Sequence, residues 1–229
     1  MTGDPGLFTP QSVTWQMHGD PMMWVAGVRA LYLQALHPRA VRGVMQNSDF
    51  RRDAWGRLMR TANFVGTTTY GTTEAAEKAG ARVRKIHTLL QATDPDTGER
   101  YRIDEPELLL WVHCAEIDSY LHVARRSGYP LTDAAADRYL AEHRFSARLV
   151  GLDPDAVPAD RAAMAAYFEK TRPELAAGAL KEGSAGTVLH GELERGYRSA
   201  VIFTFGGGNN EIQREIISWI GLGMPRVRR

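Results

Sequence analysis

The sequence predicts an all-α protein, a single multi-helix domain followed by a helical C-terminal appendage. Helix-capping residues precede most of the long segments with helical apolar spacing. Glycine or proline follows several of these segments, at the position where helices commonly end. Strand-like patterns are restricted to VGTTTYG at residues 65–71 and VIFTF at residues 201–205. We therefore expect helices throughout, with these two segments as the strand candidates.

The first helix is expected over residues 22–37. Asp20 is a good N-cap, and Pro21 suits a first helical turn because its missing N–H is not needed there. Pro38 disfavours helix at the residue before it and marks the end. The segment is apolar nearly all round, which is typical of a central, buried helix. It would line a cofactor pocket or a substrate channel, and its polar positions are Arg29, Gln34 and His37.

Two helices follow, and each begins behind a capping residue. The second is expected from near Asp53 to residue 66, and the third from residue 74 to 91 behind Thr72 and Thr73. The stretch DPDTGERYR after them is typical of a polar turn region.

Three more helices complete the domain. Asp104 and Glu107 resemble a capping box in front of a helix over residues 105–126. Thr132 caps the next, which runs to Leu149 and stops at Gly151. The last is expected over residues 159–171, behind Pro158.

Bulk composition restricts the class of protein. The chain has 229 residues, a formal net charge of +1 and one cysteine, Cys114. A near-neutral charge gives no electrostatic reason to expect nucleic-acid binding. One cysteine excludes an intrachain disulfide and a thiolate zinc site. The sequence has no signal-peptide pattern and no apolar run long enough to span a membrane, so we expect a cytoplasmic protein.

His87 is the first candidate functional residue. In RVRKIHTLLQ it lies four residues after Val83 and three before Leu90, on an apolar helix face. Spacing alone favours a core histidine bonded to a carbonyl oxygen. No second ligand follows one turn later, so a histidine-pair metal motif is absent. A single histidine does suit haem, because the porphyrin supplies four other donors. His143, by contrast, lies in polar sequence surroundings.

Arg57, Arg60 and Thr61 in RLMRT are the second candidates. Arg57 and Thr61 are one turn apart and share a helix face. Spacing alone favours solvated arginines and a threonine bonded back to its own helix. An inward-pointing arginine needs an anionic partner or a functional role.

Residues 13–175 resemble the MpaB-like family, which includes the latex-clearing rubber oxygenases. The resemblance lies in GDPMMWVAGVRALYLQALHPRAVRGVMQNSDF, RLMRTANFVGTTTYGTTEAA, RVRKIHTLLQ and PELLLWVHCAEIDSYL, in this order. It implies an all-α, somewhat globin-like domain that holds haem b. His87 matches the iron ligand, and Arg57 and Thr61 match a pair on the open side of the haem. Arg60 stands where the rubber oxygenases have lysine, and a guanidinium cannot replace a neutral amine as a ligand.

The resemblance implies a haem b-dependent oxygenase that acts on a hydrophobic small molecule, lipid or isoprenoid-like. His87 would bind the iron, Arg57 and Thr61 would contact the cofactor, and Arg57, Arg60 and Thr61 would be catalytic. Two alternatives stay open. One is a haem-binding module without turnover, and the other is a degenerate structural or interaction protein without a cofactor.

The C-terminal segment has a different character. Residues 176–229 begin with a linker. Residues 186–229 resemble the C-terminal end of acyl-CoA dehydrogenases, and the resemblance lies in FTFGGGNNEIQREIISWIGLGMPR. The position of that family's catalytic glutamate falls at Gly207, and so short a segment cannot form a flavin site, so we do not expect FAD. Its apolar stripes are expected to pack on the domain or on a second copy, which would give a homo-oligomer.

Overall fold

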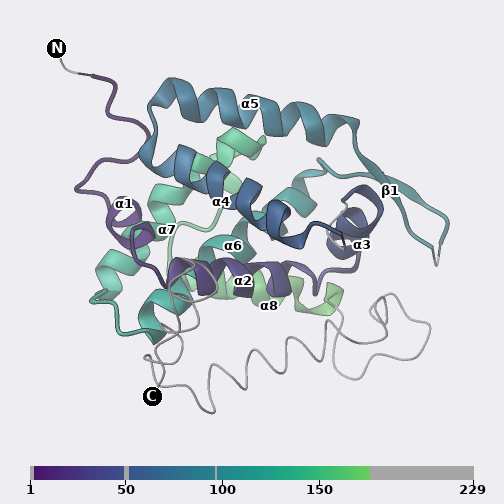
Figure 1. The fold of residues 1–229 in the computed structure, drawn as a ribbon. Helices are drawn as coiled ribbons and strands as arrows, with labels where there is room; N and C mark the ends of the chain where they lie inside the picture. The colour runs from purple at the N-terminus through teal and green to yellow at the C-terminus, as the bar shows by residue number, and fades with distance from the viewer. Residues whose placement is uncertain (1–2, 49–51, 96, 176–229) are drawn as a thin grey trace, which may run out of the picture.

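The computed structural model describes residues 3–48, 52–95 and 97–175, and in this part the predicted all-α class is confirmed (Figure 1). The described residues form eight α-helices and one short hairpin, with short 3₁₀ turns between α7 and α8 and after α8. No described helix is long and apolar enough to cross a membrane. The elements are α1 Val13–His18, α2 Met23–Gln34, α3 Pro38–Asn47, α4 Ala54–Tyr70, α5 Thr73–Leu89, β1 Gln91–Thr93, β2 Arg100–Arg102, α6 Pro106–Arg126, α7 Asp133–Ala147 and α8 Arg161–Thr171.

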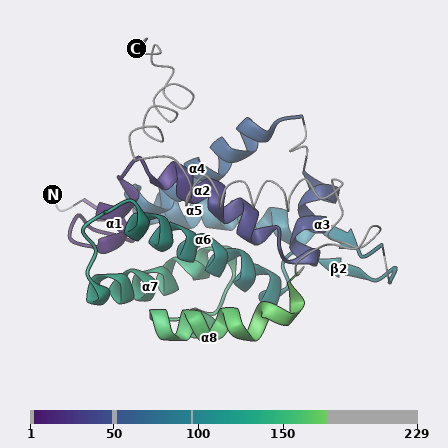
Figure 2. The ribbon, with the colours of Figure 1, turned by 90° about the horizontal axis from the view of Figure 1, so that it is seen from below.

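Helix α6 is the centre of the fold. It contributes more buried side chains than any other described helix, among them Trp111, Cys114 and Ile117. Helix α2 packs along one side of it, and α7 and α8 lie on another (Figure 2). Trp24 and Val28 of α2 are 37% and 41% exposed. The expectation that the first long apolar helix is central and buried is therefore wrong.

The polar positions of α2 connect it to its neighbours. Gln34 Nε2 donates to the Val112 carbonyl at 3.1 Å, and Trp111 Nε1 donates to the Gln34 carbonyl at 3.0 Å. Arg29 pairs with Asp118 at 2.9 Å. These contacts fix the spacing of α2 and α6 and satisfy polar groups that would otherwise be buried without partners.

The cap expected at Asp20 is wrong, because Met22 takes the N-cap position of α2 without a side-chain cap, and Asp20 Oδ1 accepts from the Met22 N–H before the helix begins. Three other capping residues are confirmed. Asp53, Thr72 and Thr132 each accept a hydrogen bond from a backbone N–H in the first turn of α4, α5 and α7. The capping box at residues 104–107 is wrong. Glu105 takes the N-cap position of α6 without a side-chain cap, because Asp104 instead binds the Arg102 guanidinium.

The strand expected over VGTTTYG is wrong, because α4 continues to Tyr70. The threonine hydroxyls find partners that suit a helix: Thr68 Oγ1 donates to the Val65 carbonyl at 3.0 Å, and Thr69 Oγ1 hydrogen-bonds to His18 Nδ1 at 3.1 Å. Packing thus overrides the β propensity of this run. The other strand candidate and the whole C-terminal appendage, with Gly207, lie outside the described residues.

Three elements were not expected. Helix α1 is short, and α3 follows His37, whose extended backbone is typical of a residue before proline. The hairpin of β1 and β2 falls partly within the predicted turn region. Its register depends on a tertiary contact, because the Gln46 side chain of α3 hydrogen-bonds to both the N–H and the carbonyl of Thr93.

Gly80 allows α5 to pack directly on the chain after α7. A Cβ at this position would lie 2.7 Å from the Leu149 carbonyl oxygen. Arg84 Nη1 donates to the same carbonyl at 2.7 Å. These two contacts fix α5 against the domain and so orient the helix that carries His87.

Candidate functional site

Two cavities occupy the space between α2, α4 and α6. The first has a volume of about 320 Å³ and also reaches α3 and the end of α5, where His87 and Leu90 line it. The second has a volume of about 420 Å³ and lies mainly between α2 and α4. Both fall in the range of small-molecule and cofactor sites, and their linings are mostly apolar. They share the wall residues Leu31, Gln34, Arg57, Leu58 and Val112.

His87 lines the first cavity with a half-buried imidazole. Its Nδ1 is buried and has no hydrogen-bond partner among the described residues, so the carbonyl bond favoured by spacing is not present there. Burial lowers the pKa of the ring, and the Asp104 carboxylate acts in the opposite direction. A lowered pKa keeps the imidazole neutral, which is the form that binds metals.

Arg57 and Thr61 face the cavities from the first half of α4. Arg57 lines both of them, and its Nη1 donates to Ser48 Oγ at 2.9 Å. Burial lowers the pKa of its guanidinium, and the nearby charge of Arg60 lowers it further. Thr61 lines the second cavity while its hydroxyl donates to the Arg57 carbonyl at 3.2 Å. No described carboxylate forms an ion pair with Arg57, so within the described part of the chain this cation faces the cavities without an anionic partner.

Arg60 lies apart from this group. Its side chain is 68% exposed and pairs with Asp53 at 3.2 Å, and neither cavity includes it in its wall. The structure thus brings His87, Arg57 and Thr61 to adjoining cavities and leaves Arg60 on the surface. Three residues correspond to slightly less than one helix turn, so the two arginines differ by about 60° around the axis of α4. Arg60 lies on the outer side of this difference, where the Asp53 carboxylate pairs with it.

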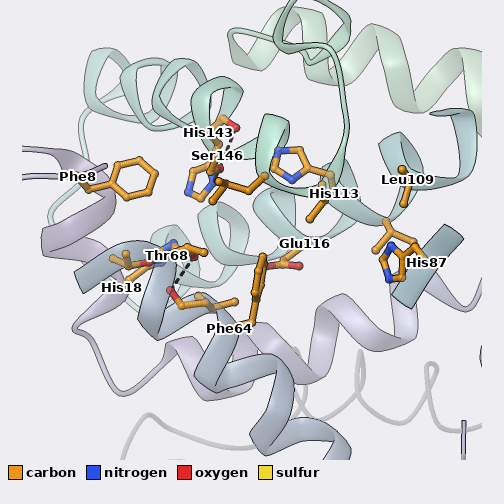
Figure 3. A pocket seen from close by; sticks show the side chains of 15 residues that line it. Phe8, His18, Phe64, Thr68, His87, Leu109, His113, Glu116, His143 and Ser146 are labelled. Atoms are coloured by element: carbon orange, nitrogen blue, oxygen red, sulfur yellow. Dashed lines mark hydrogen bonds between the residues drawn. The ribbon is translucent and has the colours of Figure 1, made fainter. Parts of the chain in front are cut away.

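A third, smaller chamber of about 80 Å³ was not expected from the sequence (Figure 3). We call it the histidine chamber and define it by His18, His113, Glu116 and His143. The rest of its lining consists of His87, apolar side chains and the hydroxyl-bearing residues Thr68, Thr69 and Ser146. Its residues come from α1, α6 and α7, which meet only in the tertiary structure. No three described histidine, cysteine, aspartate or glutamate side chains anywhere in the fold form a group suited to hold a metal ion.

The expectation that His143 lies in polar surroundings is wrong. It is 7% exposed, and its ring packs 4.5 Å from Tyr139, 5.4 Å from His18 and 5.7 Å from Phe8, measured between ring centroids. The charged residues beside it in sequence have partners of their own: the Glu142 carboxylate accepts hydrogen bonds from the Val13 and Thr14 N–H groups of α1, and Arg144 pairs with Asp155.

Burial controls the charges in the histidine chamber. It lowers the pKa of His18 and His113 to about 4, lowers that of His143 well below its ordinary value, and raises that of Glu116 to about 7. His18 has partners for both ring nitrogens, Thr69 and Tyr139. Nε2 of His113 and Nε2 of His143 are buried without any partner among the described residues.

The free energy of unfolding is expected to fall as the pH is lowered from about 6.5 to 4. In this window His18 and His113 become protonated in the unfolded chain but stay neutral in the folded protein, because their folded pKa lies below the ordinary 6.5. Proton uptake therefore favours the unfolded state. Glu116 acts in the opposite direction between about 7 and 4.5, because its folded pKa is raised. The net loss is on the order of a few kcal/mol. Urea unfolding at a series of pH values measures it.

A Glu116→Gln variant is the control for this pH dependence. It removes the opposing contribution, so its stability should fall more steeply over the same range. Equal stability of the wild type at pH 6.5 and 4.5 would contradict the burial of neutral histidines.

Comparisons with known proteins agree with both resemblances seen in the sequence. The family model described as "ER-bound oxygenase mpaB/B'/Rubber oxygenase, catalytic domain" matches residues 15–190. Acyl-CoA dehydrogenase FadE26 of Mycobacterium tuberculosis is 49% identical over 53 residues, which are 23% of this chain and 13% of that protein. The chain therefore spans only a small part of that relative, which fits the resemblance of its tail. No solved structure matches the chain.

Proposed function

This chain belongs to the family of the mpaB and rubber oxygenase catalytic domains, and on that premise we propose that it is a haem b-dependent oxygenase that acts on a hydrophobic small molecule. The substrate class we propose is lipid or isoprenoid-like. The observation that carries the proposal is His87, a half-buried imidazole whose buried Nδ1 has no partner among the described residues, in the wall of an apolar cavity.

The residues at the cavities fit haem. His87 would bind the iron, since a neutral histidine is a common axial ligand. Arg57 would meet the negative charge of the cofactor or of the bound reactant, because it lacks an anionic partner within the described chain. When bound, haem supplies an iron centre that reacts with oxygen or peroxide, chemistry that side chains alone do not provide.

The chain's own groups define the reaction space. The apolar wall formed by α2 and α4 excludes water and favours an aliphatic or isoprenoid skeleton over a polar one. Arg57 offers hydrogen bonds and positive charge where both cavities meet, and the Thr61 hydroxyl lies in the wall of the second cavity one turn away. A charge fixed in an apolar site stabilises developing negative charge more than it would in water.

Absorbance of the purified full chain tests the proposal. After supplementation with haem, a Soret band should form and titrate to one haem per chain. Oxygen or peroxide consumption with long-chain hydrophobic substrates should then accompany product formation. A Soret band without turnover would favour the haem-binding module, and no Soret band would favour the structural or interaction protein. Either outcome would reject the oxygenase.

Substitution of Arg57 and Arg60 by glutamine should separate their roles. Arg57→Gln is expected to retain haem and to lower turnover by roughly 10²–10³-fold, as expected for a fixed donor removed from a site of developing charge. Arg60→Gln should leave turnover nearly unchanged, because its side chain lies on the surface with Asp53. Haem content and steady-state rates of the two variants, measured side by side, give the comparison. Equal losses in both would contradict the assignment of Arg57.

A further inference from the structure

Glu116 lies between the histidine chamber and the second cavity. It belongs to the walls of both hollows, and it shares this position with His18, Val65 and Val112. Its side chain is half-buried, and the Tyr120 hydroxyl, one turn further along α6, lowers the pKa of the carboxyl. No described cation forms an ion pair with it. A carboxyl group in the wall of two hollows, without an ion pair to stabilise its charge, is a candidate for proton exchange.

The histidine chamber offers the partners that a buried water needs. Nε2 of His113 and Nε2 of His143 lack partners among the described residues, and the carboxyl of Glu116 lies in the same wall (Figure 3). A water needs about 10–15 Å³ of free space and two to four polar neighbours. The volume of about 80 Å³ provides that space. Water would satisfy nitrogens whose burial is otherwise costly.

We propose that the histidine chamber is a water-holding proton-exchange site, in which Glu116 passes a proton between chamber water and a molecule in the second cavity. The Glu116 O–H bond breaks, and its proton goes to an acceptor atom of that molecule. The carboxylate then regains a proton from chamber water. The hydroxide that is left takes a proton from Nε2 of His143, while Nδ1 of the same ring takes one up from solvent through the Ser146 hydroxyl, so the imidazole stays neutral. His113 holds the same water at its Nε2. No electrons are transferred.

The surroundings of Glu116 support this exchange. Burial brings the pKa of its carboxyl to about 7, where both protonation states are populated near neutral pH. The Tyr120 hydrogen bond lowers this pKa and so limits the rise. The titratable or charged groups that share its cavities or interact with its carboxyl are His18 of α1, Asp20 between α1 and α2, Arg57 and Tyr70 of α4, His87 of α5, His113 and Tyr120 of α6, and Tyr139 and His143 of α7.

Infrared spectroscopy of the full chain without haem tests the site directly. A protonated-carboxyl band should disappear with a midpoint near pH 7, far above the range of exposed carboxyls. The band should be missing in Glu116→Gln and retained in Glu107→Gln, a matched change at an exposed position of the same helix. Tyr120→Phe should move the midpoint to higher pH, because the hydrogen bond that favours the carboxylate is lost.

Two results would overturn the proposal. One is a wild-type spectrum without a carboxyl that titrates near neutral pH. The other is a high-resolution crystal structure that shows no ordered water at Nε2 of His113 and His143. If Glu116→Gln fails to fold, the shift in Tyr120→Phe decides the question, since no shift would also reject it.

The proposal rests on the proposed function only for the identity of the molecule in the second cavity. A chain that lacks a Soret band but shows the Glu116 titration would reject the haem oxygenase and retain the exchange site. Normal haem binding without the Glu116 titration would reject the exchange site and leave the haem oxygenase in place. In a turnover assay, Glu116→Gln should flatten the pH dependence near 7 while haem content stays normal.

Discussion

Replacement of His87 by alanine is expected to abolish haem binding by the full chain. His87 is the histidine in the wall of the first cavity, and its Nδ1 has no competing partner in the described part of the fold. Loss of an iron ligand should exceed the roughly 10–100-fold loss of metal affinity seen when groups that only support a ligand are changed. The Soret band during haem titration is the measurement, and circular dichroism should show unchanged helix content.

The matched control is His122→Ala. His122 is also a half-buried histidine, but it lies outside all three hollows. The His122→Ala variant should bind haem as the wild type does. If His87→Ala retains its full haem content, the ligand is another histidine, and His113 or His37 would then be the next to change.

Replacement of Trp111 by alanine is expected to destabilise the protein by about 3–5 kcal/mol, the usual cost of removing a buried aromatic side chain. Trp111 is fully buried on α6 and lies 5.7 Å from Phe168 of α8, measured between ring centroids. Its indole N–H also holds the last residue of α2 through the Gln34 carbonyl. The change therefore leaves a cavity at the junction of two helices that line the candidate site, and it removes one of the two hydrogen bonds to the Gln34 carbonyl, which keeps the one from the His37 N–H. Denaturant unfolding measures the loss.

Trp55→Ala is the control for the tryptophan change. Trp55 is 53% exposed and stacks on Trp24 at 6.5 Å, so its removal should cost less than about 1 kcal/mol. A similar loss in both variants would show that α6 is not the centre of the stable core.

The caps at Asp53, Thr72 and Thr132 were predictable, because a capping side chain bonds to backbone within three residues of itself. The strand assigned to VGTTTYG was wrong for the opposite reason. The Thr69 hydroxyl, in a helical residue, hydrogen-bonds to His18, which lies 51 residues away in the chain. No local sequence pattern reveals such a partner. The short hairpin depends in the same way on Gln46 of α3.

The sequence by itself determined the all-α class, the positions of the long helices and, through resemblance, the family and His87 as the candidate ligand. These depend on spacing along the chain, which helix geometry converts directly into faces and ends. Only the tertiary structure decided that Arg57 faces the cavities while Arg60 pairs with Asp53 on the surface. It also brought His18, Glu116 and His143 to one chamber from three separate helices. Burial and proximity arise when helices pack, and the pKa values of these groups follow from that packing.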